Sequence, residues 1–207
     1  MAASLCWKAV EAEFPGLKVD GELVGGIKCQ WITPATEVEG PEVVLYLFGG
    51  GFIVGCPQDD LQMTARLATQ LRRRVCVPHY RLAPEHPFPA ALEDARAVFC
   101  ELSSKFRVMV VGESAGGNLA LQLLQTCELG NVTAAALFSP WIDLTHSGDS
   151  HAVLDDPTLS KTAFLEPAAA AYAGKLALSD VSPLFGSFPA RFPPVIISSG
   201  TRDLLLR

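Results

Sequence analysis

The chain has 207 residues, of which 49% are hydrophobic and 18% are charged, and its formal net charge at pH 7 is −6. This length and composition suit a single α/β domain whose sheet is buried on both faces, and the negative charge argues against nucleic acid or an anionic membrane surface as a partner. The six cysteines show no C-x-x-C spacing, and there is neither a basic leader nor an apolar run near the ~20 residues of a membrane span, so we expect a reduced, cytoplasmic protein.

The first predicted elements are two short strands, residues 17–24 and 27–33, joined by Gly25-Gly26. This dipeptide is typical of a two-residue hairpin turn, so we expect an antiparallel pair at one edge of a sheet. An apolar run of strand length, residues 43–48, then stops at Gly49-Gly50-Gly51. Three successive glycines let backbone amides turn toward a ligand at the carboxyl end of a strand, and a flexible turn is the plain alternative.

A regular alternation of strand and helix follows. Its members are a helix at 59–71, a strand at 75–80, a proline-containing loop at 81–89, a helix at 90–102, a strand at 108–112, a helix through 119–124 and a strand at 134–139. This order is typical of a parallel sheet built from right-handed βαβ units.

The turn after the strand at 108–111 has the sequence Gly112-Glu113-Ser114-Ala115-Gly116. A sharp turn from strand to helix strains its central residue and brings the positions two before and two after it together, where only glycine fits. Ser114 would then stand at the carboxyl end of a strand, and the Ala115 amide would point into the same space. The pattern predicts a nucleophile elbow, and a merely structural glycine-rich turn is the alternative.

Residues 143–182 break the alternation. The segment is long, with short helices expected around Thr162 and over residues 168–178, and we interpret it as a lid inserted into the single domain of residues 1–207. The alternation resumes with a strand at 195–199, and Asp203 follows that strand.

Four motifs in this order resemble the hormone-sensitive-lipase-like (family IV) esterase branch of the α/β-hydrolase fold superfamily. They are the glycine loop at 49–52, Tyr-Arg-Leu-Ala-Pro-Glu at 80–85, Gly-Glu-Ser-Ala-Gly-Gly at 112–117 and Gly-Thr-Arg-Asp at 200–203. The resemblance runs from residue 43 to the last residue. It implies a mostly parallel central sheet with helices on both faces, and a carboxylesterase- or lipase-like serine hydrolase. Such an enzyme acts on a small-molecule ester without a cofactor or metal.

The resemblance also implies the site residues. Ser114 corresponds to the nucleophile, and Asp203 to the acid that orients an imidazole and stabilises its charged form. The amides of Gly50, Gly51 and Ala115 correspond to the oxyanion hole, which holds the charge of the tetrahedral intermediate.

Further residues have two interpretations. Phe52 and Trp141 could line the acyl pocket, and plain core packing is the alternative for both. Asp143 is a rival for the acid, or else it braces its own loop. The chain also departs from the family in two places, because Phe48 stands where the glycine loop usually begins with histidine, and His79 stands where an acidic residue commonly precedes the Tyr-Arg-Leu-Ala-Pro-Glu motif.

In this family the catalytic histidine follows the acid, and no histidine follows Asp203 here. Of the four histidines, only His146 and His151 could turn toward Ser114. We therefore expect a C-terminally incomplete version of a longer esterase that lacks the last strand and helix, and loss of the base would lower its turnover about a millionfold. The alternatives are a non-catalytic small-molecule binding module, like the plant gibberellin receptor of this fold, and an inactive fragment. The sequence leaves the oligomeric state open.

Overall fold

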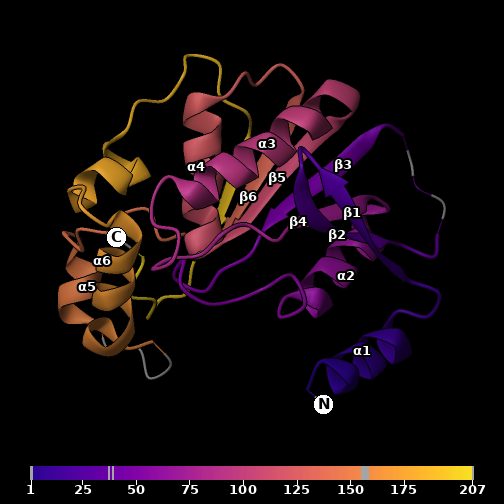
Figure 1. Ribbon diagram of the computed structural model, residues 1–207, viewed down its shortest axis with the longest axis horizontal. Helices are drawn as coiled ribbons and strands as arrows, with labels where there is room; N and C mark the ends of the chain where they lie inside the picture. Colours follow the sequence, from indigo (N-terminus) through magenta and orange to yellow (C-terminus); the bar gives the residue numbers. More distant parts are fainter. Residues whose placement is uncertain (1, 37, 39, 155–158, 207) are drawn as a thin grey trace.

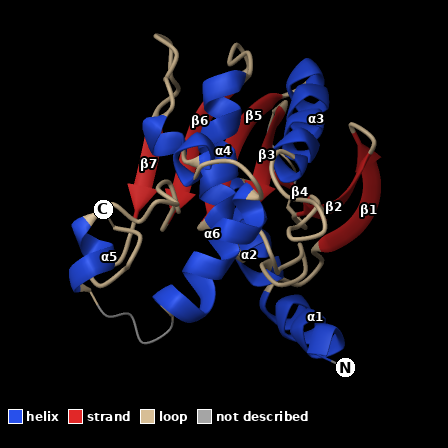
Figure 2. Cartoon of the chain, turned by 60° about the vertical axis from the view of Figure 1, so that its left-hand side comes forward, coloured by secondary structure: helices blue, strands red, loops and turns tan. Residues whose placement is uncertain are grey.

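The computed structural model describes residues 2–36, 38, 40–154 and 159–206, with side chains from residue 8 onward. Within these residues seven strands form one sheet in the order β1-β2-β4-β3-β5-β6-β7 (Figure 1, Figure 2). The strands are β1 (Lys18–Val24), β2 (Ile27–Thr33), β3 (Glu42–Leu47), β4 (Arg74–Pro78), β5 (Arg107–Glu113), β6 (Val132–Phe138) and β7 (Val195–Ser198). The β1–β2 and β2–β4 pairs are antiparallel and the other pairs are parallel, which confirms the predicted α/β class.

The N-terminal hairpin has the predicted turn at Gly25 and Gly26. Val24 pairs with Ile27 across the turn, and the two glycines have φ angles of +59° and +78°. Glycine adopts this left-handed region without steric cost, which is what a two-residue turn requires. A Cβ atom at Gly25 would lie 2.4 Å from the carbonyl oxygen of Ala97, so the turn also presses on helix α3 (Ala90–Lys105).

The middle of the sheet is buried on both faces. All residues of 44–47 in β3 and of 75–77 in β4 are at most 1% exposed. Because neighbouring residues of a strand point to opposite faces, other elements must cover both faces of these strands. This burial explains the continuous apolar runs that the sequence shows here.

Helices α3 and α4 (Ala115–Thr126) pack side by side against the sheet, and α2 (Leu61–Leu71) packs against β2 and β4 (Figure 1). The sequence patterns did not predict α1 (Ala2–Glu13), which packs against α2 near the N-terminus (Figure 2). Val10 of α1 is buried, and Glu13 forms an ion pair with Arg66 of α2. No helix in the part of the chain that the structure describes combines the length and apolar character needed to cross a bilayer.

Residues 143–154 and 159–182 fold into a group of short helices. They are α5 (Asp149–Val153), the π-helical turn η1 (Lys161–Leu165), α6 (Glu166–Ala173) and the 3₁₀ turn η2 (Leu178–Val181), with η3 (Pro183–Phe185) just after the segment. The predicted helix at 168–178 is wrong at its C-terminal end, because α6 ends before Gly174, which has a φ of +63°. Tyr172 of α6 accepts a hydrogen bond at its carbonyl oxygen from the Phe88 N–H at 2.8 Å, which joins the insertion to the loop before α3.

Strand β7 borders the sheet beside β6. Ile196 and Ile197 are 72% and 60% exposed, because β6 is the one strand among the described residues that pairs with β7. Residues 199–206, which follow β7, form turns, and Leu204 among them is buried. The Leu204 carbonyl oxygen accepts a hydrogen bond from Ser150 Oγ of α5 at 2.9 Å, so this segment packs against the insertion.

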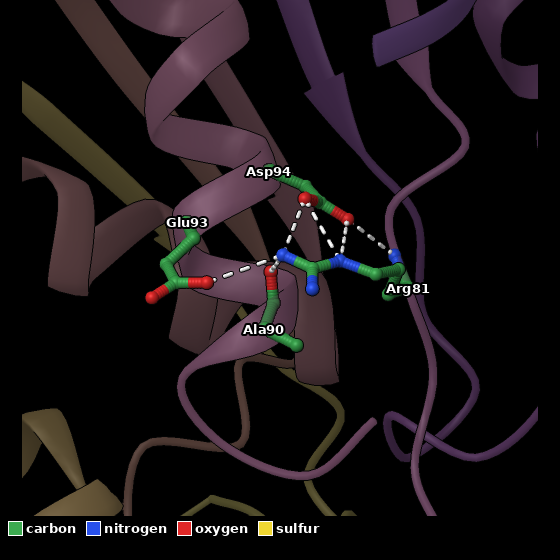
Figure 3. A network of polar contacts seen from close by, with 4 residues as sticks. All are labelled: Arg81, Ala90, Glu93 and Asp94. Atoms are coloured by element: carbon green, nitrogen blue, oxygen red, sulfur yellow. Dashed lines mark hydrogen bonds and ion pairs between the residues drawn. The ribbon is translucent and has the colours of Figure 1, made fainter. Parts of the chain in front are cut away.

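An ion pair anchors the loop at 81–89 to α3 (Figure 3). The Arg81 guanidinium donates to both carboxylate oxygens of Asp94 at 2.8–3.0 Å, and the Arg81 backbone N–H donates to Asp94 Oδ2 at 2.8 Å. Arg81 Nη2 also donates to the Ala90 carbonyl oxygen at 3.3 Å and to Glu93 Oε2 at 3.2 Å. Because Asp94 is buried, its charge depends on Arg81 for compensation.

Replacing Arg81 and replacing Asp94 should lower the free energy of unfolding by different amounts. Arg81→Met should lower the free energy of unfolding by about 3 kcal/mol, because it leaves a buried carboxylate without its counter-ion. Asp94→Asn should cost less, roughly 1–2 kcal/mol, because Arg81 is 42% exposed and water can hydrate it. Urea unfolding measures both, with the exposed Glu93→Gln as a control expected to change stability by less than about 0.5 kcal/mol. Equal losses in the Arg81 and Glu93 variants would contradict the anchoring role.

Candidate active site

Ser114 lies at the turn between β5 and α4, with φ +52° and ψ −116°. A residue other than glycine at positive φ is strained, so surrounding contacts must hold it there. The Ser114 N–H donates to the Phe138 carbonyl oxygen at 2.9 Å, and the Ser114 carbonyl oxygen accepts from the N–H groups of Gly117 at 3.0 Å and Trp141 at 2.9 Å. These bonds fix the serine between the ends of β5 and β6 and leave its side chain partly exposed.

The two flanking glycines of the turn have no room for a side chain. A Cβ atom at Gly112 would lie 2.4 Å from the Gly116 carbonyl oxygen, and one at Gly116 would lie 2.0 Å from the Leu47 carbonyl oxygen. The first turn of α4 therefore touches the backbone of β3 directly. This close approach matches the steric requirement from which the sequence pattern predicts the turn.

The glycine loop reaches the same edge of the sheet as Ser114. Strands β3 and β5 are parallel neighbours, with Leu47 paired to Gly112, so the loop after β3 lies beside the turn after β5. Gly50, Gly51 and Phe52 have φ angles of +108°, +62° and +66°. This left-handed backbone folds the loop back on itself, and the Gly50 carbonyl oxygen accepts from the Val54 N–H at 3.1 Å.

The Tyr-Arg-Leu-Ala-Pro-Glu segment braces the glycine loop from behind. The Tyr80 hydroxyl donates to the Phe48 carbonyl oxygen at 2.7 Å, and the Tyr80 ring stacks on the Phe48 ring with centroids 4.1 Å apart. The Ala83 N–H donates to the Phe52 carbonyl oxygen at 2.9 Å. At the position where the resembled family has histidine, aromatic stacking on Phe48 supports the loop here.

A pair of carboxyl groups lies under the glycine loop, and the sequence reading did not identify it. A Cβ atom at Gly49 would lie 2.0 Å from Glu113 Oε2, and the Gly49 N–H favours the charged forms of both Glu113 and Asp60. The Tyr46 hydroxyl donates to Asp60 Oδ2 at 3.1 Å. Glu113 precedes the candidate nucleophile in the motif, which is the signal that could have drawn attention to it.

The pKa values of this carboxyl pair are raised. Burial, followed by the negative charge of Asp60, raises the pKa of Glu113 to about 7, with a smaller contribution from Asp203 and opposition from the Gly49 N–H. Burial also raises the pKa of Asp60, which the Tyr46 hydroxyl partly offsets. The pair therefore holds a proton near neutral pH, directly behind the glycine loop.

Asp203 follows β7 in a turn that fixes its carboxylate. Ser199 Oγ donates to Asp203 Oδ2 at 2.9 Å, and the Leu205 N–H donates to Oδ1 at 2.9 Å. The charge of Asp203 acts on Glu113, which precedes Ser114. The candidate acid and the candidate nucleophile thus share the carboxyl-end edge of the parallel strands.

Asp143, the rival acid, is occupied within its own loop. Its two carboxylate oxygens accept hydrogen bonds from the N–H and hydroxyl groups of Thr145 and Ser147, at 2.6–2.9 Å. Burial opposes ionisation, but these hydrogen bonds outweigh it and lower the pKa of Asp143. This geometry favours the bracing role over the catalytic one.

His146 and His151 form an aromatic stack with Trp141. The two imidazole rings have centroids 4.0 Å apart, and the His146 ring lies 5.6 Å from Trp141. Burial lowers the pKa of both histidines, so both are neutral at pH 7. Among the described side chains, no group of three or more His, Cys, Asp or Glu residues is arranged to hold a metal ion.

The two candidate pocket residues have different surroundings. Phe52 is fully buried and stacks on Tyr172 of α6 with centroids 3.6 Å apart. Trp141 lines a cavity of about 130 Å³ together with both stacked histidines and Leu204. Phe52 therefore packs beneath the insertion, and Trp141 faces a cavity beside the Asp203 turn.

Comparison with known proteins places these features in one family. A family model described as the alpha/beta hydrolase fold matches residues 44–207. The chain is 35% identical over 195 residues to an acetyl-hydrolase of Streptomyces hygroscopicus, covering 88% of this chain and 63% of that one. It is 28% identical to an esterase of Acinetobacter venetianus, covering 80% and 58% of the two chains. The chain thus spans less than two thirds of the length of these relatives.

Solved structures agree with the sequence comparison. A hormone-sensitive lipase from a metagenome library superposes with a TM-score of 0.86 at 29% identity, covering 96% of this chain and 73% of that chain. An esterase/lipase from an uncultured bacterium superposes with a TM-score of 0.83 at 29% identity, covering 99% and 73%.

The contact of Gly116 with β3 leads to a stability prediction. Gly116→Ala should lower the free energy of unfolding by about 3 kcal/mol or more, because the methyl group would overlap the Leu47 carbonyl oxygen, which belongs to rigid backbone. Gly130→Ala is the matched control, since a Cβ atom there would meet nothing within 4 Å. Urea unfolding of the two variants measures the difference, and similar losses in both would refute the close approach.

The raised pKa of Glu113 leads to a prediction about pH. The unfolded chain ionises this carboxyl near its ordinary value of 4.5, whereas the folded chain holds the proton until about pH 7. The protonated Glu113 side chain therefore stabilises the folded chain fully below pH 4.5, and this stabilisation is lost as the pH rises through 7. With allowance for solvent screening, the loss should be about 2 kcal/mol.

Glu113→Gln removes this ionisation, so the stability of the variant should fall less between pH 5 and 8 than that of the unchanged chain. Asp60→Asn should also flatten the profile, because it removes the charge that raises the Glu113 pKa. Urea unfolding at intervals of pH measures the profiles. Parallel profiles for all three proteins would show that Glu113 ionises normally.

Proposed function

Because the chain belongs to the α/β-hydrolase fold family, in its hormone-sensitive-lipase-like branch, we propose that it is built to hydrolyse small-molecule carboxylic esters with Ser114 as the nucleophile. The observation that carries the proposal is the strained backbone of Ser114, at φ +52°, beside the glycine loop of a neighbouring parallel strand. A nucleophile elbow needs this conformation, because it raises the hydroxyl above the end of the sheet.

The proposed chemistry is acyl transfer. The Ser114 hydroxyl gives its proton to a base as its oxygen attacks the ester carbonyl carbon, and the carbonyl oxygen takes up the negative charge of a tetrahedral intermediate. When the intermediate collapses, the bond to the alcohol oxygen breaks and the alcohol leaves with that proton. Water then hydrolyses the acyl-serine and restores the Ser114 hydroxyl.

The N–H groups of Gly50, Gly51 and Ala115 form the oxyanion hole in this proposal. Ala115 is the first residue of α4, and the N–H groups at the start of a helix favour an anion. This position supports its role in the oxyanion hole.

Asp203 is the proposed acid of the triad. Each carboxylate oxygen accepts one hydrogen bond from its own turn, which fixes the group and leaves further lone pairs for an imidazole. The residues after Asp203 include no histidine, and His146 and His151 are stacked on Trp141. We therefore assign the nucleophile, the oxyanion hole and the acid to this chain, and assign none of its 207 residues to the base.

We also propose that residues 143–182 act as a lid. A Cβ atom at Gly51 would lie 2.9 Å from the Phe164 ring and 3.2 Å from the Ala168 methyl group, so the insertion covers the glycine loop closely. A cover of this kind excludes water from the oxyanion hole and limits the space for the acyl group. Trp141 is the proposed residue of the acyl pocket, and Phe52 packs beneath the proposed lid.

A reducing compartment such as the cytoplasm is the proposed location. The five cysteines with described side chains, Cys29, Cys56, Cys76, Cys100 and Cys127, are all free. Free thiols in this number are typical of proteins kept under reducing conditions.

Chemical rescue by imidazole tests the proposed function. Without a base, a serine triad loses about a millionfold in turnover, so a typical rate near ten per second falls to about one event per day. Free imidazole should restore part of this loss, raising the hydrolysis of p-nitrophenyl acetate by the chain at least about tenfold. A fluorophosphonate probe in the same buffer should add its mass at Ser114, as found by peptide mass spectrometry.

Ser114→Ala is the control, because it should leave only the hydrolysis that imidazole performs in solution. Asp203→Asn should weaken the rescue severalfold, since the added imidazole loses the group that orients it. Equal rates for the unchanged chain and the Ser114 variant would refute the nucleophile. Saturable binding of a non-hydrolysable ester analogue without labelling or rescue would support a non-catalytic binding module instead.

A further inference from the structure

Two cysteines outside the proposed active site lie together at the C-terminal halves of neighbouring helices. Cys100 belongs to α3, and Cys127 directly follows the last residue of α4. The two helices pack side by side (Figure 1), both cysteines line one surface hollow, and the neighbouring Cys100 thiol contributes to raising the pKa of Cys127. The fold therefore brings two free thiols, 27 residues apart in the sequence, to the same part of the surface.

The pair is open to solvent on one side. Cys100 is exposed and Cys127 is half-buried, and both line a surface hollow of about 510 Å³. A small thiol reagent can therefore reach Cys100 directly, and Cys127 lies next to any group attached there.

The hollow also offers charged and polar groups. Arg96 lines it and its positive charge acts on the Cys127 thiol, and Ser103 and Ser104 are further lining residues. Glu128 contributes one opposing negative charge to the rim. A guanidinium beside two thiols suits a disulfide that carries carboxylates.

We propose that Cys100 and Cys127 form a redox-active pair that reacts with a small carboxylate-bearing disulfide of the glutathione class and closes a reversible disulfide between α3 and α4. This reaction is independent of ester hydrolysis, so the failure of one proposal leaves the other standing.

The reaction proceeds in two exchanges. The Cys100 thiolate attacks one sulfur of the small disulfide, whose S–S bond breaks, and the first small thiolate leaves and takes up the proton that Cys100 released. The Cys127 sulfur then loses its proton and attacks the Cys100 sulfur, and the second small thiol leaves with that proton. Two protein thiols are oxidised by two electrons in total, and one small disulfide is reduced to two thiols.

The order of attack follows from exposure. Cys100 meets the reagent first because it is exposed, whereas burial and the neighbouring Cys100 raise the pKa of Cys127, with Thr126 and Arg96 acting in the opposite direction. Cys127 therefore remains a thiol during the first step and is placed to resolve the mixed disulfide.

A second cysteine pair in the same molecule provides an internal control. Cys29 of β2 and Cys76 of β4 lie on paired strands, where Cys29 is opposite Pro78, two residues from Cys76, and both are fully buried within the sheet. A water-soluble disulfide cannot reach them while the protein is folded. In both pairs the two cysteines are neighbours, but a reagent in solution can reach only Cys100 and Cys127.

The experiment uses the chain with Cys6→Ser and Cys56→Ser, which leaves only the two pairs. The folded protein is incubated with glutathione disulfide, quenched with acid and analysed by peptide mass spectrometry without reduction. Trypsin separates Cys100, in the peptide 97–105, from Cys127, in the peptide 108–161. We expect these two peptides to be joined with the loss of two hydrogens, and dithiothreitol to reverse the change.

Two single variants test the order of the steps. Cys127→Ser should accumulate a stable glutathione adduct at Cys100, and Cys100→Ser should react at Cys127 at least about tenfold more slowly than the pair. The oxidised pair should also raise the midpoint of thermal unfolding by roughly 5 °C, because the bond restricts the unfolded chain.

Three results would overturn the proposal. They are a lasting glutathione adduct at Cys100 although Cys127 is present, a disulfide that joins different molecules, and oxidation of Cys29 and Cys76 at the same rate as Cys100 and Cys127. The last result would mean that the reagent acts on unfolded protein.

Discussion

The first turn of α4 rests on the backbone at the end of β3, and the space between them admits no side chain. Three features of the site depend on this contact. It holds Ser114 at a positive φ, it sets the distance between the turn at Ser114 and the glycine loop, and it directs the N-terminus of α4 toward the space above both. Native contacts must hold a backbone strain of roughly 1–3 kcal/mol, and parallel strands buried on both faces are rigid enough to do so.

The loops around Ser114 are held by different kinds of interaction. Aromatic stacking and a hydroxyl group hold the back of the glycine loop through Tyr80, and the ion pair of Arg81 with Asp94 ties that brace to α3. Under the loop, Glu113 and Asp60 form a titratable support. The aromatic packing does not change with pH, whereas the charge of the carboxyl pair does. A change of pH therefore acts on the glycine loop mainly at Gly49, whose N–H group faces this pair.

Local chemistry decided which features could be predicted from the sequence. The Gly25-Gly26 turn, the buried strands and the sharp turn at Ser114 follow from steric rules that act within a few residues, and the structure agrees with them. Helix α1 has only a weak apolar stripe, so its pattern gave no signal, and α6 ends early because Gly174 adopts a positive φ. The carboxyl pair is non-local, since Asp60 and Glu113 meet only once β3 and β5 are paired. The role of Asp143 in its own loop rests on hydrogen bonds that its carboxylate accepts from Thr145 and Ser147, and the sequence does not reveal these bonds.

The strand order also constrains how the molecule assembles. Strand β4 lies between β2 and β3, both of which precede it in the chain, so the sheet cannot grow strand by strand in sequence order. The β1–β2 hairpin meets the rest of the sheet only through its antiparallel ladder with β4. We expect such a unit to open as one segment while the β3–β5 core stays closed. Amide hydrogen exchange would therefore divide the molecule at the β2–β4 ladder, with the turn at Ser114 and the glycine loop in the slowly exchanging part.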